Sequence, residues 1–318
     1  MTSGSENVPA DVPDRERHAR PTGPATDLAP FVSVIIPVKD DSLRLALCLE
    51  ALSRQHYPSS AYEVIVVDNG STDRPGEVVA RFPGVRLLTE PKPAADRARN
   101  VGIRAARGEI LGFTDSDCLP RPDWLRRGAS RVADQDPPGL IAGRIVVTSR
   151  PGVRPSLAEL HDLVLAFPQA RCVRRSHYGA TANLFTRREV FTAVGLLRED
   201  YGGDAEWGLR VHRAGRPVEY ADDVVVEHPA RQSLSALVAR TRRGARELYA
   251  WRRHRPWLLA RDQLKELVPP PDFIWKIVTS PVLTTPWDRA RVLLVFVGLR
   301  YVRLVERTRL LLGAEPVR

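Results

Sequence analysis

Three short apolar segments alternate with segments of helical spacing in the first half of the chain. They read VSVIIPV (Val32 to Val38), YEVIVVD (Tyr62 to Asp68) and EILGFTD (Glu109 to Asp115). Near-continuous apolar runs rich in β-branched residues are typical of strands buried on both faces. Strands that alternate with helices form a parallel sheet covered by helices. The sequence therefore predicts an α/β fold with a mostly parallel central sheet.

The other expected elements follow from periodicity, proline and glycine. Helices are predicted at residues 42–55, 75–82, 94–107 and 122–133, with a short strand at 85–88 between the second and third. The second half is less regular. It is expected to contain a strand at 140–148, a helix or lid at 156–167, a helix at 187–194, a helix starting near Asp204 and a strand pair at 217–228.

Composition divides the chain into three parts. Residues 1–30 are rich in proline and charged residues without apolar continuity, which predicts a disordered leader and no signal peptide. Residues 1–230 carry 30 Lys and Arg against 31 Asp and Glu, whereas residues 231–318 carry 18 against 7. The last part is therefore expected to be a basic region of amphipathic helices, broken by Pro256, by prolines 269–271 and by Pro286.

Cysteine use and hydropathy bear on the compartment. The three cysteines, Cys48, Cys118 and Cys172, are far apart in the sequence and form no CxxC motif, so neither a disulfide framework nor a structural zinc site is expected. No apolar run reaches the roughly 20 residues that span a bilayer. A cytoplasmic protein is expected, with peripheral attachment to the inner face of the plasma membrane as an alternative.

The apolar segment that starts at Glu109 ends in two carboxylates, Asp115 and Asp117, separated by one serine. Residues i and i+2 of an extended chain point to one face, so the two charges crowd unless a cation lies between them. Paired carboxylates with few other ligands suit Mg²⁺ or Mn²⁺, which share their coordination with substrate phosphates. The alternative is that these residues are turn or capping residues.

Two more acidic positions have both a functional and a structural interpretation. Asp68 ends an apolar strand at the rim where such sheets bind ligands, and its carboxylate could accept the imide N–H of a pyrimidine. The Asn69-Gly70 pair after it is also an ordinary turn signal. Asp204 stands at the expected start of a helix, where capping is the structural alternative to catalysis.

Taken together, five ordered segments resemble family 2 glycosyltransferases of the GT-A fold. They are VSVIIPVKDD, EVIVVDNGSTD, RARNVGIRAARGEILGFTDSDCLPRPDWL, ATANLFTRREVFTAVG and GGDAEWGLRVHRAG. The resemblance covers about residues 32–228. It implies a GT-A-like domain at 31–230 that moves a hexose-type sugar, with inversion, from a nucleotide-diphosphate sugar to an acceptor hydroxyl. A UDP-sugar is the expected donor.

The resemblance also implies site residues. Asp115 and Asp117 match the metal-binding DxD motif, Asp204 matches the catalytic base, and His228 stands where relatives place a histidine near the metal. The ion would be Mn²⁺ or Mg²⁺. The residues that would contact the sugar nucleotide are Pro37, Asp40, Asp68, Arg97, Asn100, Asp115, Glu206 and Trp207.

Two departures from the family pattern matter. Relatives commonly have an acidic pair before the catalytic helix, but here Gly203 precedes Asp204, so a second carboxylate would come from Glu206 or be absent. No QxxRW motif follows, which predicts a non-processive enzyme. The acceptor is expected to be lipid-linked, or a cell-envelope or secondary-metabolite glycan.

Two other classes of protein remain as alternatives. A haloacid-dehalogenase-like phosphatase also uses a strand-ending DxD with Asp115 as nucleophile, but the threonine it needs after the second Asp is missing. A nucleic-acid-binding protein could use the basic tail, but no aromatic and basic interleaving supports it, so no nucleic acid is expected.

The segment from Arg291 to Gly313 combines an apolar face with five arginines. They are Arg291, Arg300, Arg303, Arg307 and Arg309. Such a helix can rest on an anionic membrane surface, or it can pack on the catalytic domain with its arginines reaching past it to solvent. Both alternatives remain open on the sequence alone.

Overall fold

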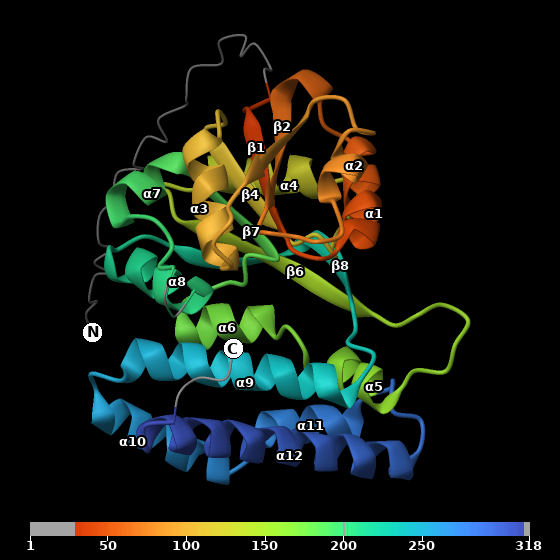
Figure 1. Cartoon of the computed structure of the whole chain (residues 1–318), viewed down its shortest axis with the longest axis vertical. Coiled ribbons are helices and arrows are strands. Elements are labelled where there is room, and N and C mark those ends of the chain that lie inside the picture. Colours follow the sequence, from red (N-terminus) through yellow and green to blue (C-terminus); the bar gives the residue numbers. More distant parts are fainter. Residues whose placement is uncertain (1–28, 200, 202, 315–318) are drawn as a thin grey trace, which may run out of the picture.

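The computed structural model describes residues 29–199, 201 and 203–314, so the expected leader lies almost wholly outside the described residues. An eight-stranded sheet in the order β3-β2-β1-β4-β7-β6-β8-β5 forms the centre (Figure 1). The strands are β1 (Val32–Val38), β2 (Tyr62–Asp68), β3 (Val85–Thr89), β4 (Ile110–Thr114), β5 (Leu119–Pro120), β6 (Leu140–Thr148), β7 (Asn183–Arg187) and β8 (Val218–Pro229).

The half of the sheet formed by β3, β2, β1 and β4 is entirely parallel, as predicted. Strand β7 then pairs antiparallel with β4 and β6, while β8 runs parallel to β6. Pairing of β1 with β4 ends at Ile35 and Phe113, so Pro37, which has no N–H, lies beyond that ladder. The carboxyl ends of β1, β2 and β4 therefore meet at one edge.

Two helical layers cover this sheet. On one face lie α1 (Ser42–Ser53), α2 (Pro75–Val79) and α4 (Trp124–Ala133), whose apolar residues share a core with β1 and β2. On the other face α3 (Ala95–Ala105), α7 (Arg188–Val194) and α8 (Gly203–Arg213) pack around Ile35 and Phe113. The sheet is thus buried on both faces, which explains its near-continuous apolar strands.

Sequence patterns misjudged part of the second half. The predicted strand pair at 217–228 is wrong, because β8 is a single strand whose register with β6 shifts between Gly143 and Arg144. The short strands β5 and β7 and the helix α6 (Gln169–Ser176) were not predicted. The two strands are too short to show a period, and α6 carries little apolar signal.

The C-terminal region consists of helices separated at the predicted prolines. They are α9 (Leu234–Arg252), α10 (Pro256–Leu267), α11 (Pro271–Thr279) and α12 (Pro286–Leu311). Three of them start with proline, whose fixed φ and missing N–H suit the first helical turn. Helix α5 (Leu157–Leu165) shares a core with α11 and α12, so this layer also uses a helix from before residue 231 (Figure 1).

Helix α12 packs on its neighbours, and some of its arginines form ion pairs inside the helical layer. Arg300, Arg303 and Arg307 converge on Glu266 of α10 at N···O distances of 3.5, 3.1 and 2.6 Å. The side chains of Arg300 and Arg307 are only 8% and 1% exposed, so these two arginines neither face a membrane surface nor reach past the helix to solvent. Within the described residues, no helix is long and apolar enough to cross a bilayer.

Candidate active site

The loops after β1 and β2 are bonded to each other at the carboxyl edge of the sheet. Asp40, at a left-handed φ of 51°, accepts hydrogen bonds from the backbone N–H and hydroxyl of Thr72 at 2.7 and 2.9 Å. The backbone bond from Thr72 is the main reason that the pKa of Asp40 is lowered. The Ser42 N–H, at the start of α1, donates to Asp73 over 2.7 Å. These bonds fix the rim on which a nucleotide would lie.

The turn after β2 is both a structural brace and part of this rim. The buried Asn69 donates to the carbonyls of Glu90 and Lys92, both at 2.8 Å, and Gly70 adopts a φ of 76°. Asp68 accepts the Ser71 N–H at 2.9 Å and stays half-buried at the strand end. The turn interpretation is therefore correct for Asn69 and Gly70, and it leaves oxygen atoms of Asp68 available for a base.

Asp115 and Asp117 follow β4 at the same edge. Nη2 of the buried Arg99 on α3 donates to Oδ1 of Asp115 over 2.7 Å. The serine between the two carboxylates, Ser116, donates to Asp41 over 2.9 Å. Burial and the nearby Asp115 raise the pKa of Asp117, although His228 and Arg44 oppose the shift. Negative charge is thus concentrated here, as expected for a cation site.

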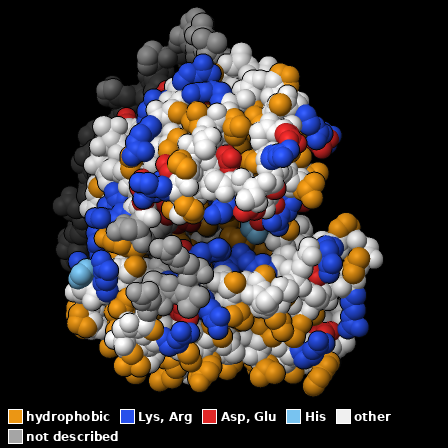
Figure 2. Space-filling view, viewed as in Figure 1, with side chains coloured by type: hydrophobic (Ala, Val, Ile, Leu, Met, Phe, Trp, Pro, Cys, Tyr) orange, Lys and Arg blue, Asp and Glu red, His pale blue; other side chains and the backbone are white. Residues whose placement is uncertain are grey.

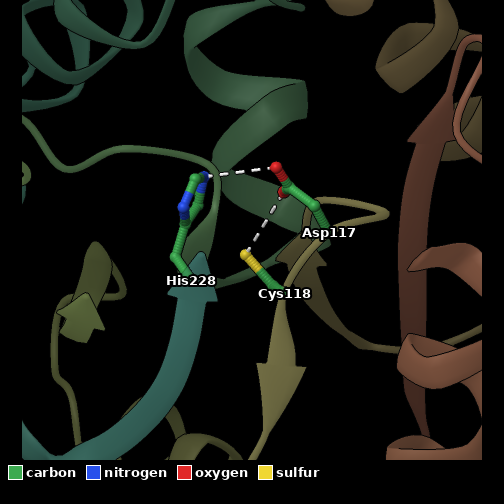
Figure 3. A group of neighbouring side chains, drawn as sticks. All are labelled: Asp117, Cys118 and His228. Carbon is green, nitrogen blue, oxygen red and sulfur yellow. Dashed lines mark hydrogen bonds and ion pairs between the residues drawn. The ribbon is translucent and has the colours of Figure 1, made fainter. Parts of the chain in front are cut away.

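His228, at the end of β8, comes to the same place (Figure 3). Its Nε2 lies 3.5 Å from Oδ2 of Asp117, while its Nδ1 lies 2.8 Å from the Pro229 carbonyl. A carbonyl only accepts, so Nδ1 carries a proton and Nε2 faces the carboxylate. Metal-bound histidines typically donate the N–H of the ring nitrogen that does not bind the metal to a group such as a backbone carbonyl. This donor set fits a divalent cation.

Cys118 also lies in this cluster, and its ligand atom lies within 4.8 Å of those of Asp117 and His228. Its thiol is fully buried, and burial raises its pKa well above the usual range. A protonated thiol is a poor ligand for a hard ion such as Mg²⁺ or Mn²⁺. The oxygen atoms of the two aspartates and Nε2 of His228 are therefore the suitable ligands.

Asp204, in the first turn of α8, is held by one neighbouring residue. Thr181 donates its N–H to Oδ2 over 3.1 Å and its hydroxyl to Oδ1 over 2.9 Å. Burial raises the pKa of Asp204 to about 6, with Asp96 adding to the shift and Arg99 opposing it. A carboxylate with this pKa is suited to general base catalysis near neutral pH.

The second carboxylate near Asp204 does not come from Glu206. Both oxygens of Glu206 accept from Nε of Arg210, at 3.0 and 2.9 Å, and its side chain is only 9% exposed. Asp96 of α3 lies beside Gly203 instead, since a Cβ at that glycine would be 2.9 Å from Oδ2 of Asp96. The two sources considered from the sequence, Glu206 or none, are thus replaced by Asp96.

Three other residues expected to contact substrate serve mainly as supports in this structure. Asn100 is buried and exchanges hydrogen bonds with the backbone of Leu197 at 2.9 and 3.1 Å. Trp207 is 1% exposed and donates to the Gly195 carbonyl over 3.0 Å. Arg97 pairs with Glu199 at 3.0 Å and is partly exposed. Of these, Arg97 alone keeps an accessible polar group.

Two residues that sequence reasoning missed connect the parts of this site. Arg99 bonds Asp96 at 2.9 Å and Asp115 at 2.7 Å, and its positive charge also acts on Asp204. Arg44 on α1 lies 3.8 Å from Asp117. The signal for Arg99 was its i, i+3 spacing from Asp96, which directly precedes the RARN segment and lies on the same helix face.

Two sequence comparisons match this chain to known glycosyltransferases. The family model described as Glycosyl transferase family 2 matches residues 33–195. The chain is 35% identical over 233 residues to glycosyltransferase AglE of Haloferax volcanii, which covers 71% of this chain and 76% of that protein.

Solved structures share the fold. A mannosyltransferase from Pyrobaculum calidifontis, in complex with GDP-Man and Mn²⁺, superposes with a TM-score of 0.57 at 20% identity over 91% of both chains. Residues 1–349 of TarS from S. aureus, in complex with UDP-GlcNAc, superpose with a TM-score of 0.50 at 16% identity, covering 89% of this chain and 92% of that one. At these identities the likeness establishes the fold alone.

Proposed function

The chain belongs to glycosyl transferase family 2, and we propose that it transfers one sugar, with inversion, from a nucleotide-diphosphate sugar to an acceptor hydroxyl. The observation that carries this proposal is the arrangement of charge around Arg99. Its guanidinium bonds Asp115 of the DSD segment at 2.7 Å and also acts on Asp204. A cation site and a general base are thereby held next to each other.

Asp115, Asp117 and His228 are the residues that would hold a divalent ion. Once bound, Mn²⁺ or Mg²⁺ neutralises charge on a diphosphate leaving group. Support comes from the donor set described above, and from Mn²⁺ in the complex of the Pyrobaculum relative. Asp40 and Asp68, on the rim formed by the β1 and β2 loops, would line the nucleotide pocket together with Pro37.

Asp204 would take the proton from the attacking acceptor hydroxyl. The oxygen of that hydroxyl forms the new bond to the anomeric carbon, and the bond from that carbon to the diphosphate oxygen breaks with its electron pair. A single displacement of this kind inverts the anomeric centre. Positioned base catalysis contributes about 10²- to 10⁴-fold. Orientation of donor and acceptor on the rigid sheet edge supplies a further part of the rate.

The donor follows from the class of ligand that the site suits. Relatives were solved with GDP-Man and with UDP-GlcNAc, so a nucleotide-diphosphate sugar is supported, and a UDP-sugar remains our proposal. The acceptor, which we propose to be lipid-linked or a cell-envelope or secondary-metabolite glycan, would bind beside Asp204.

A surface for a membrane lies on the outer face of the C-terminal helices. Leu294, Val297, Tyr301 and Val305 of α12, spaced three or four residues apart, are between 37% and 73% exposed. Trp257, Trp275 and Trp287 are 65–69% exposed. Figure 2 shows apolar side chains along the lower rim of the molecule, where Figure 1 has α10 and α12. Exposed tryptophans beside basic residues suit the interface of an anionic bilayer.

The alternatives drawn from the sequence are not favoured. A phosphatase would need Asp115 as a free nucleophile, whereas Arg99 is bonded to it. The basic excess that suggested nucleic acid is partly used inside the C-terminal helices, where three arginines share Glu266. The comparisons also match glycosyltransferases.

The test is a thermal-shift panel of UDP, GDP and dTDP sugars with and without Mn²⁺. A ligand that binds the native state raises the melting temperature. We expect one class of nucleotide sugar to raise it, and to do so more when Mn²⁺ is present. Absence of a shift with every donor would contradict the proposed function.

A further inference from the structure

A hollow separates the sheet-bearing part of the protein from the helices beneath it, and basic side chains gather in it (Figure 2). Helix α9 runs below the sheet edge (Figure 1) and buries Leu237 and Ala245. Arg240 and Arg243 lie three residues apart on this helix, so they project from one side of it. The side chains of Arg240 and Arg243 are exposed, whereas those of Leu237 and Ala245 are buried.

Two aromatic residues relate these arginines to the catalytic edge. The Phe167 ring lies 4.5 Å from the His228 ring, and the guanidinium groups of Arg231 and Arg240 lie 5.9 and 5.4 Å from the same Phe167 ring. Tyr178 packs against Gly208 of α8, the helix that carries Asp204, and the charges of Asp204 and Arg240 both act on the pKa of its phenol. Arg240 therefore lies on the side of α9 that faces the catalytic edge, and Arg243 follows three residues later on the same side of the helix.

In the part of the chain that the structure describes, acidic side chains act on Arg240 and Arg243 only without direct ion pairs: Asp162 acts on Arg240, and Glu247 interacts with both. Arg231 has a direct partner, since its Nη1 lies 2.8 Å from Asp162. Among residues 29–199, 201 and 203–314, neither Arg240 nor Arg243 has a carboxylate within 4 Å. Burial of part of the Arg240 side chain, together with the charges of Arg231 and Arg243, lowers the pKa of Arg240. An anion in the hollow would relieve this repulsion.

We propose that Arg240 and Arg243, with Arg231, bind a phosphate group carried by the acceptor. The inference rests on the proposed function, in which Asp204 faces the acceptor hydroxyl. The donor diphosphate has its own counter-charges at the sheet edge, namely Arg44 and the cation site. Arginine forms paired, charge-assisted hydrogen bonds to phosphate, which gives orientation as well as affinity.

The experiment titrates inorganic phosphate into the full chain by calorimetry, with Mg²⁺ and whichever of UDP, GDP or dTDP binds already saturating. The test variant is R240A/R243A. The control is R242A/R253A, which removes the same charge from exposed positions of α9 and its end. We expect phosphate affinity to fall about tenfold or more in the test variant alone, and to recover only in part in R240K/R243K, which restores the charge but not the paired hydrogen bonds.

Three results would overturn the proposal. Unchanged phosphate affinity in R240A/R243A would remove the site, and a parallel loss of nucleotide binding would assign these arginines to the donor diphosphate. Loss of flotation with phosphatidylglycerol vesicles, with phosphate affinity unchanged, would assign them to lipid headgroups. If wild-type protein binds no nucleotide, the proposed function fails, and the titration without nucleotide still tests the arginines.

Discussion

Oδ2 of Asp96 lies 2.9 Å from the point that a Cβ would occupy at Gly203. The glycine has a φ of 40°, a conformation that side chains disfavour, so both backbone and space require glycine there. Helix α3 thereby brings a carboxylate next to the start of α8, where Asp204 follows. The neighbouring acid that the sequence lacks before Asp204 is supplied from another element.

The first prediction concerns the effect of the Asp96 charge on the pKa of Asp204. Asp96 raises the pKa of Asp204, so D96N should lower it. Asp204 must be ionised to accept a proton, and wild-type kcat/KM should therefore fall below about pH 6. In D96N this fall should begin at lower pH. A pH profile of kcat/KM checks it, and an acid limb that does not move would show that Asp96 does not act on the base.

Removal of the Arg99 charge should shift the pKa of Asp204 in the opposite direction. Arg99 stabilises the ionised form of Asp204, and R99M should therefore raise the pKa of that carboxyl and move the acid limb to higher pH. R99K keeps the charge and should restore most of the wild-type profile. If R99M and D96N displace the limb in the same direction, the electrostatic account of the site is wrong.

Removing the base itself should separate chemistry from donor binding. D204N should lower kcat by about 10²- to 10⁴-fold and leave nucleotide affinity within a few-fold of wild type. D222N, at a residue whose side chain is 70% exposed, is the matched control and should keep full activity. Full turnover by D204N would reject Asp204 as the base.

The cation site can be tested without turnover. D117N and H228A should each weaken the Mn²⁺-dependent part of nucleotide binding by about tenfold or more, as loss of a metal ligand or its support does. C118A should change it little, because the buried thiol stays protonated. Calorimetry with and without Mn²⁺ makes the comparison. Equal effects of C118A and H228A would contradict the proposed ligand set.

If the outer face of the C-terminal helices binds membranes, substitutions there should weaken vesicle binding without changing the active site. W275S/W287S removes two side chains that are each 69% exposed, so folding should be preserved. Burying a large apolar side chain is worth ~1.5–3 kcal/mol, and the loss of two should weaken binding to phosphatidylglycerol vesicles by on the order of 10²-fold. L43S, exposed on α1, is the control. Equal flotation of all three proteins would remove this surface.

Elements with strong periodicity could be predicted from the sequence, and the bounds of β1, β2 and β6 agree with it residue by residue. The breaks between the C-terminal helices also agree, because proline acts locally. The proximity of Asp117 and His228 was expected from the family pattern and from the rule that parallel strands end at one edge.

What could not be predicted depends on contacts between distant segments. Arg97 and Arg99 are both arginines of the same helix. Only tertiary packing determines that Arg99 is the one buried between Asp96 and Asp115. The sequence of α12 suggested an amphipathic helix with its arginines at the surface. In the structure, three of these arginines form ion pairs with Glu266 of α10. The place of α9 below the sheet edge likewise depends on tertiary packing.

Anomalous diffraction from crystals grown with Mn²⁺ and a bound nucleotide diphosphate would locate the cation itself. We expect a manganese peak at bonding distance from Asp117 and from Nε2 of His228, with the diphosphate on its other side. Nucleotide bound with no manganese at these residues would contradict the proposed cation site.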